Sequence, residues 1–184
     1  MERETERQMF HIFVGVLAIL LLLHYGRTFM IAAVFFIIIF GTIFINLKLL
    51  GGKIPIIDWF ERKFERPVVR LPGWGSACYA MGALIPLVFL TDVNRIAACI
   101  FVLAFGDGLS TLVGLKGKLK IPYNQKKTVE GSIAMLISAA FSYYFIGWVA
   151  IPLAIVAAII ESMPIVDDNI SIPIACTIVL LVIK

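Results

Sequence analysis

Charged side chains are scarce in this chain. They make up 15% of its 184 residues, whereas 61% of the residues are hydrophobic. In a soluble domain of this size about a quarter of the residues are charged and about half are apolar. The composition therefore excludes an ordinary soluble domain and indicates an integral membrane protein. Because the formal net charge is only +4, the position of the charges along the chain is more informative than their sum.

Cysteine is also rare, and its placement excludes two kinds of site. The three cysteines, Cys78, Cys99 and Cys176, are far apart and all lie in apolar segments. An odd, dispersed and buried set argues against a disulfide framework and against a zinc site. The chain has no internal repeats and no low-complexity tracts.

Long apolar runs fill most of the chain instead. Since about 20 apolar residues cross a bilayer, we expect an all-α, polytopic fold with about seven transmembrane helices, forming a single membrane domain over residues 1–184. The run that starts at residue 129 is too long for one span, so we divide it at Gly147-Trp148. The predicted spans lie near residues 8–24, 28–50, 74–90, 95–113, 129–146, 148–163 and 170–184.

The basic residues are distributed unequally between the two sides of this arrangement. Thirteen of the sixteen Lys and Arg residues fall on the side that holds the N-terminus and the segments 51–73, 114–128 and 164–169. The positive-inside rule makes this side cytoplasmic. The candidate polar groups gather on the same side. We therefore expect an active site on the cytoplasmic face of a plasma membrane or an ER-type membrane.

Asp107 is the first candidate, because it lies among glycines in an otherwise apolar segment. Gly106, Gly108 and Gly114 leave space beside the backbone, where N–H groups can approach an anion. An aspartate in or near a span costs about 2.5–3.5 kcal/mol on insertion scales, which favours a function or a partner for it. Asp107 could hold Mg²⁺ on a nucleotide or take a proton from a substrate hydroxyl. The alternative is an interhelical hydrogen bond or an ion pair, for example with Arg7.

The second candidate is the run that contains Lys126, Lys127, Thr128 and Glu130. Thr128 is a suitable N-cap for the helix that follows, so the free N–H groups of that helix would lie beside two lysines. Such a combination is an anion-binding site. The alternative is a basic loop that merely follows the positive-inside rule.

The third candidate is acidic and consists of Glu161 with Asp167-Asp168-Asn169. Glu161, Asp167 and Asp168 offer several hard oxygen ligands, which suit Mg²⁺ and also Ca²⁺. A turn that only caps the following helix would have the same composition.

Two further segments flank these candidates. Arg7 and His11 are four residues apart and therefore share one helix face, where they could contact phosphate or lie at the interface as ordinary residues. Residues 54–67 have apolar positions at helical spacing and charges on the remaining faces, which predicts a short helix in the headgroup region.

Taken together, several of these runs resemble one known family, the CTP-dependent lipid-alcohol kinases. This family includes dolichol, polyprenol and phytol kinases and a diacylglycerol kinase. It is related to the phosphatidate cytidylyltransferases. The matching runs are Asp107-Gly-Leu-Ser-Thr-Leu-Val-Gly114, Pro122, Lys126-Lys-Thr-Val-Glu-Gly-Ser132, Arg7-Gln-Met-Phe-His11-Ile-x-x-Gly15, and Glu161 with Asp167-Asp-Asn-Ile-Ser-Ile-Pro173. One departure is Gln8, which stands where the family has a second basic residue.

The resemblance implies transfer of the γ-phosphoryl group of CTP to the hydroxyl of a membrane lipid alcohol, with a polyprenol or dolichol as the first choice and diacylglycerol as the second. It implies catalytic roles for Asp107, Lys127 and Glu130. The groups expected at the nucleotide are Gly106, Gly108, Gly114, Lys126, Lys127, Thr128, Arg7 and His11. The expected ligands of Mg²⁺ (or Ca²⁺) are Asp107, Glu161, Asp167 and Asp168.

Two alternatives stay open beside this expectation. A CTP-dependent cytidylyltransferase would use the same nucleotide and make a CDP-lipid. A small membrane transporter would also contain acids near the membrane, although it would expose sites on both sides. No nucleic acid partner is expected, and the sequence leaves the oligomeric state open.

Overall fold

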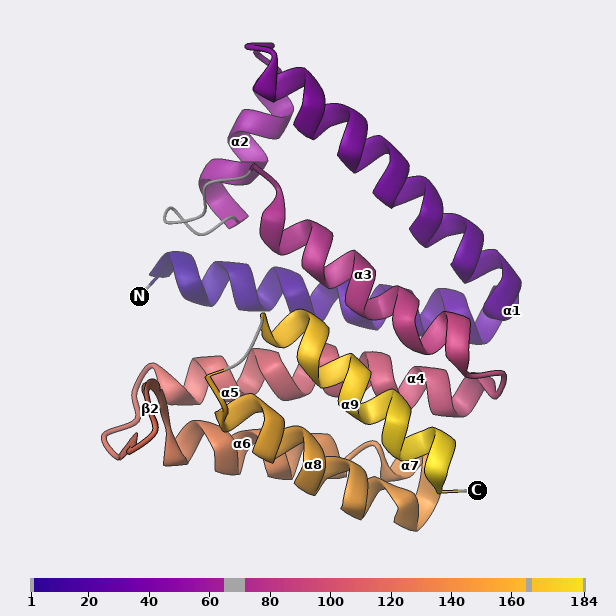
Figure 1. Cartoon of the computed structure of the whole chain (residues 1–184), viewed down its shortest axis with the longest axis vertical. Helices are drawn as coiled ribbons and strands as arrows, with labels where there is room; N and C mark the ends of the chain where they lie inside the picture. The colour runs from indigo at the N-terminus through magenta and orange to yellow at the C-terminus, as the bar shows by residue number, and fades with distance from the viewer. Residues whose placement is uncertain (1, 65–71, 165–166, 184) are drawn as a thin grey trace.

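The computed structural model describes residues 2–64, 72–164 and 167–183, and in these ranges it is almost entirely helical (Figure 1). The all-α class is therefore confirmed, apart from one small antiparallel hairpin that was not predicted. The elements are α1 (Glu2–Leu49), α2 (Pro55–Phe64), α3 (Trp74–Phe89), α4 (Val93–Phe101), a π-helical segment (Val102–Gly106), α5 (Asp107–Gly114), β1 (Lys120–Ile121), β2 (Asn124–Thr128), α6 (Val129–Ala140), α7 (Tyr143–Ile146), a 3₁₀ turn (Gly147–Val149), α8 (Ala150–Ser162) and α9 (Asp168–Val182).

The first helix is broken where the sequence predicts a gap between two spans. Gly26 has φ 81° and ψ 177° inside α1, a backbone conformation that favours glycine because it has no Cβ. The two halves of α1 diverge from this point, and the second half runs along the outside of the molecule (Figure 1). Residues 65–67 of the predicted headgroup helix lie outside the described residues, whereas residues 55–64 form α2 as expected.

The long apolar run after residue 129 folds back on itself, as predicted. Gly147, at the predicted division, has φ 58°, and α6 and α8 pack against each other. The predicted boundary at residue 146 is wrong in one respect, because α6 already ends at Ala140. Residues 141–149 form the reversal, which contains α7 and the 3₁₀ turn.

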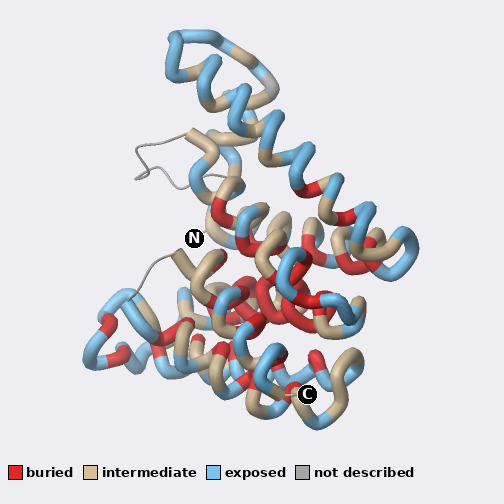
Figure 2. The backbone as a smooth tube through the Cα atoms, turned by 45° about the vertical axis from the view of Figure 1, so that its right-hand side comes forward, coloured by how far each residue is buried: buried red, intermediate tan, exposed pale blue. Residues whose placement is uncertain are grey.

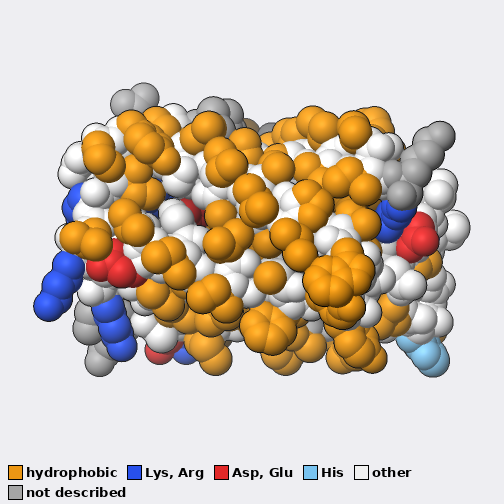
Figure 3. Space-filling view, turned by 90° about the horizontal axis from the view of Figure 1, so that it is seen from below, with side chains coloured by type: hydrophobic (Ala, Val, Ile, Leu, Met, Phe, Trp, Pro, Cys, Tyr) orange, Lys and Arg blue, Asp and Glu red, His pale blue; other side chains and the backbone are white. Residues whose placement is uncertain are grey.

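The number of membrane spans stays a prediction. By length and composition, three helical stretches in the described residues could cross a membrane: Arg3–Leu49, Val93–Gly114 and Val129–Ser162. The first of them is broken at Gly26 and the third reverses at residues 141–149. Helices α3 and α9 are also apolar but contain 16 and 15 residues. At 1.5 Å per residue they are about 24 and about 22 Å long, shorter than the ~30 Å hydrocarbon core of a bilayer. Figure 3 shows a broad hydrophobic surface bounded by charged side chains at both ends.

The buried core centres on α4 and the π-helical segment, with buried residues of α1, α3, α6, α8 and α9 around them. Figure 2 shows the buried residues concentrated in the middle of the molecule. All three cysteines are buried and free. The N-terminus, the hairpin and the start of α9 lie at one end of the molecule, opposite the kink in α1 and the C-terminus (Figure 1). The candidate residues from three distant parts of the sequence can therefore meet at this end.

Candidate functional site

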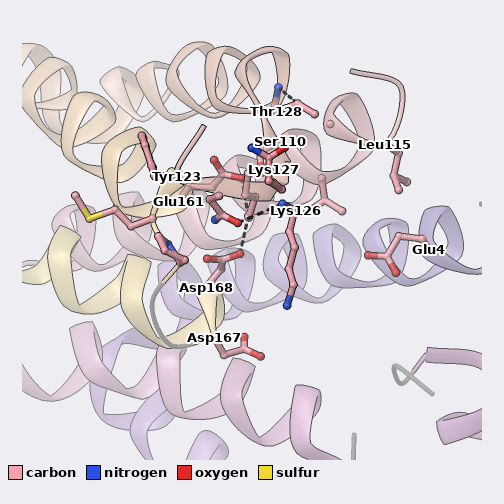
Figure 4. Close-up of a pocket in the computed structure, with 17 residues that line it drawn as sticks. Glu4, Ser110, Leu115, Tyr123, Lys126, Lys127, Thr128, Glu161, Asp167 and Asp168 are labelled. Atoms are coloured by element: carbon pink, nitrogen blue, oxygen red, sulfur yellow. Dashed lines mark hydrogen bonds and ion pairs between the residues drawn. The ribbon is translucent and has the colours of Figure 1, made fainter. Parts of the chain in front are cut away.

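A pocket of about 640 Å³ opens at the end of the molecule that holds the hairpin (Figure 4). It lies between α5, the hairpin, the end of α8 and the start of α9, with the first turn of α1 at its margin. Its walls are formed by Glu4, Ser110, Thr111, Gly114, Leu115, Tyr123, Asn124, Gln125, Lys126, Lys127, Thr128, Gly131, Glu161, Met163, Pro164, Asp167 and Asp168.

Lys127 is the central group of the pocket. Its Nζ lies 2.6 Å from Oε1 of Glu161 on α8 and 2.7 Å from Oδ2 of Asp168 on α9. The side chain of Glu161 is only 2% exposed, and its second oxygen accepts a hydrogen bond from the hydroxyl of Ser132 at 3.0 Å. One ammonium group therefore joins strand β2 to two helices that are more than thirty residues away in the sequence.

The hairpin that carries Lys127 is fixed to α8 by polar side chains. The hydroxyls of Tyr123 and Ser162 are 2.8 Å apart, and Nδ2 of Asn124 donates to the carbonyl oxygen of Ser162 at 3.0 Å. At the other end of β2, Thr128 is the N-cap of α6 and accepts a hydrogen bond from the N–H of Gly131. This confirms the predicted cap.

The charges around Lys127 favour its protonated form. Burial of the ammonium lowers its pKa, but the negative charges of Asp168, Glu161 and Asp107 outweigh burial, so the pKa of Lys127 is raised above its usual value. The lysine is therefore a fixed positive charge at neutral pH. Lys126, its neighbour on β2, lines the same pocket and is exposed.

Asp107 is buried and begins α5 directly after the π-helical segment. A π-helical turn shifts the hydrogen-bonding register of a helix, and such turns occur frequently at functional sites. A ring nitrogen of His11, from α1, lies 3.1 Å from the carbonyl oxygen of Leu103 in this segment and 3.8 Å from the carboxylate of Asp107. The structure thus brings together two predicted residues, Asp107 and His11, just behind the pocket.

Other predicted residues lie elsewhere. Arg7 forms an ion pair with Glu4 of its own helix. The carboxylate of Glu130 accepts hydrogen bonds from the backbone N–H groups of Lys118 and Leu119, and therefore holds the loop before the hairpin.

Two of the three predicted glycines serve helix packing in the structure. A Cβ at Gly106 would lie 2.6 Å from the sulfur of Met135, and one at Gly108 would lie 2.8 Å from Cγ1 of Ile12. These glycines allow α6 and α1 to approach closely. Gly114, in contrast, lines the pocket.

The acidic residues predicted to bind metal do not form a complete ligand set. Among the described residues, no three acidic, histidine or cysteine side chains converge as metal ligands. Lys127 lies between Glu161 and Asp168, and Asp167 caps α9 by accepting the N–H of Asn169 at 3.1 Å. Sequence reasoning missed Tyr123, which lines the pocket, and did not give Ser132 a role, although Ser132 ends the Lys-Thr-Val-Glu-Gly-Ser run.

The chain is similar to several known proteins. It is 35% identical over 175 residues to an uncharacterized protein of Methanocaldococcus jannaschii, with 93% of this chain and 89% of that protein covered. It is 35% identical to phytol kinase 1, chloroplastic, of Arabidopsis thaliana, over 55% of this chain and 40% of that protein. It is 33% identical to farnesol kinase, chloroplastic, of the same plant, over 53% and 39% of the two lengths. No family model and no solved structure matches the chain.

The chain belongs to the same family as the archaeal protein, because the similarity extends over most of both sequences. It matches about two fifths of the length of the two plant kinases. Relatives named phytol kinase and farnesol kinase support the lipid-alcohol kinase family that the motifs suggested.

Proposed function

We propose that this protein is a membrane kinase that transfers the γ-phosphoryl group of CTP to the hydroxyl of a prenyl-type lipid alcohol. The observation that carries the proposal is the pocket itself. Lys127 on β2 contacts the carboxylates of Glu161 and Asp168, and its neighbour Lys126 lines the same pocket at the polar end of an apolar helix bundle. The similarity to proteins named phytol kinase and farnesol kinase supports a prenyl alcohol as the acceptor.

Phosphoryl transfer mainly requires positioning of the reactants and neutralisation of charge. In the proposed reaction the alcohol oxygen forms a bond to the γ-phosphorus of CTP. The bond from that phosphorus to the bridging oxygen breaks, and CDP leaves. Lys126 and Lys127 would contact the phosphates as point charges. The hydroxyl proton would pass to a carboxylate, for which Asp107 and Asp168 are the two candidates.

Mg²⁺ fits this site as a cation shared with the nucleotide. Mg²⁺ is usually held by one or two carboxylates together with substrate phosphates and water, so a complete protein ligand set is not required. Asp167, Asp168 and Glu161 supply suitable oxygens at the pocket wall. When bound, the ion would neutralise the charge of the phosphates. In this proposal Lys127 balances the acids before the nucleotide enters and turns to the phosphates when it does.

The first experiment uses purified protein in lipid nanodiscs with CTP labelled at either the α or the γ phosphorus. Phytol, farnesol, a polyprenol, dolichol and diacylglycerol are tested as acceptors, and ATP is tested as a competing donor. We expect γ-label in a lipid monophosphate and release of CDP. Asp107→Asn and Asp168→Asn are expected to lose transfer while remaining folded.

Lipid that carries only α-label, with release of pyrophosphate, would overturn the proposal in favour of a cytidylyltransferase that makes a CDP-lipid. Lipid without label from either nucleotide would reject both enzyme activities. Radiolabelled solute uptake into proteoliposomes would then test the transporter alternative.

A further inference from the structure

A second hollow lies beside the proposed active site, on the other side of the first turns of α1. It measures about 1110 Å³ and lies between α1, the end of α2 and the end of α5. In Figure 1 the N-terminal part of α1 runs between α2 and α5. Most of the side chains that line it are apolar: Met9, Phe10, Phe13, Phe64, Leu112 and Leu115. We refer to this hollow as the α1–α5 groove.

The groove has a closed wall and an open apolar face. The rings of Phe10 and Phe64 stack with their centroids 4.4 Å apart, which fixes α2 against α1. In contrast, Met9 and Phe13 are 58% and 63% exposed although they are large and apolar. Side chains of this kind gathered in one hollow mark a binding site for an apolar ligand or a membrane contact.

The groove joins the nucleotide pocket at Leu115, which lines both hollows. Leu115 and Glu4 lie on the side of the pocket opposite Tyr123 and Glu161 (Figure 4). The charged side chains that line the groove are Glu6, Lys63 and Lys116, and Nζ of Lys63 lies 3.8 Å from the carboxylate of Glu6. The two hollows therefore adjoin at Leu115, with polar groups on the side of Lys127 and mostly apolar side chains on the side of Phe13.

We propose that the α1–α5 groove holds the hydrocarbon chain of the acceptor alcohol, with the hydroxyl passing Leu115 to reach the phosphates. This inference rests on the proposed function, since the kinase reaction requires an acceptor that is polar at one end and apolar along the rest. A chain in the groove would cover Met9, Phe13 and Leu112, and Leu115 would lie beside the carbons next to the hydroxyl. The groove, rather than the pocket, would then select among lipid alcohols.

The test replaces Leu112 by tryptophan, which narrows the groove, and compares it with Val113→Trp. Val113 is the next residue of the same helix, and it lines a different apolar surface together with Phe105 and Phe141. We expect Leu112→Trp to raise the KM for a long-chain prenyl alcohol about tenfold, because a few methylene groups lose their contacts. The KM for CTP should not change. A short alcohol of two prenyl units should be affected less, and Val113→Trp should resemble wild type.

A second measurement requires neither activity nor a variant. A prenyl alcohol with a photoreactive diazirine at the end remote from the hydroxyl is bound to the wild-type protein, activated by light and located by peptide mass spectrometry. We expect the label on Met9, Phe13 or Leu112, and excess unlabelled alcohol should compete for it. Label confined to other surfaces, or label here that the alcohol does not displace, would overturn the groove assignment and indicate ordinary bilayer contact.

Failure of this inference differs from failure of the proposed function. If wild type transfers γ-label and Leu112→Trp does so with an unchanged KM for every chain length, the kinase stands and the groove assignment is wrong. If wild type transfers no label but the diazirine alcohol labels the groove competitively, the groove binds a prenyl chain and the kinase proposal is wrong.

Discussion

Replacing Lys127 by methionine is the most informative single change, because it removes the positive charge from the ion-paired cluster of Lys127, Glu161 and Asp168. Methionine keeps most of the length of the side chain but leaves the carboxylates of Glu161 and Asp168 without their shared cation. Removal of one partner from a buried ion pair typically costs about 3–5 kcal/mol, mostly because a charge remains buried and uncompensated. The side chains of Lys127 and Asp168 are each about one fifth exposed, so we expect the lower end, about 3 kcal/mol.

A loss of about 3 kcal/mol corresponds to a decrease in the melting temperature of about 6–12 °C for a domain of this size. Thermal unfolding in detergent measures it. Lys126→Met is the matched control, since it removes the same charge from the neighbouring position of β2, where the side chain is exposed. An exposed substitution of this kind usually changes the free energy of unfolding by less than about 0.5 kcal/mol. Equal melting temperatures for the two variants would refute the buried-charge reasoning.

Two further measurements test the cause of the loss. In Lys127→Met combined with Asp168→Asn, one of the two carboxylates left without a cation is neutral, so we expect roughly half of the lost stability to return. The pKa of Lys127 is raised in the folded state. The contribution of Lys127 to the free energy of unfolding is therefore complete below the pKa of lysine in the unfolded chain, about 10.4. It is lost only as the pH rises through the pKa of Lys127 in the folded protein. The difference in the free energy of unfolding between wild type and Lys127→Met should be constant from about pH 7 to about pH 9.

Two other predictions concern packing and topology. Gly82→Ala should lower the free energy of unfolding by about 2–4 kcal/mol, because the new Cβ would overlap a backbone carbonyl oxygen of α9 that cannot move away cheaply. Gly41→Ala is the control, since nothing lies within 4 Å of its new Cβ, and it should be neutral or slightly stabilising. Equal effects of the two substitutions on thermal unfolding would contradict this account. For topology, a cysteine at position 92 should react with an impermeant maleimide only from the outside. A cysteine at position 120 should react only from the cytoplasmic side. Labelling of both positions from one side would reject the seven-span arrangement.

The sequence predicted the parts of the fold that depend on local chemistry. The helix break near Gly26, the reversal near Gly147 and the N-cap at Thr128 each follow from the residue type at that position. The hairpin was missed because β1 has two residues and β2 is strongly polar, so neither has the apolar alternation typical of a strand. The turn residues between Pro122 and Asn124 were the available signal.

The site was predictable as a list of residues but not as an arrangement. Nothing in the spacing of the sequence indicates that Lys127 meets Glu161 and Asp168, since this contact depends on how α8 and α9 pack beside the hairpin. The glycines around Asp107 were interpreted as space for an anion, whereas Gly106 and Gly108 allow close contact between helices. Glycine serves both purposes, and only the neighbouring elements distinguish them.

The charge of the pocket explains why the proposed nucleotide would need a divalent cation. Four carboxylates, those of Glu4, Glu161, Asp167 and Asp168, line the pocket together with two lysines, Lys126 and Lys127. Two positive charges against four negative ones do not attract a triphosphate by themselves. A cation that brings positive charge to the phosphates reverses this balance, because the carboxylates then become attractive. Within the proposal, the acids and the lysines are therefore complementary parts of one nucleotide–metal site.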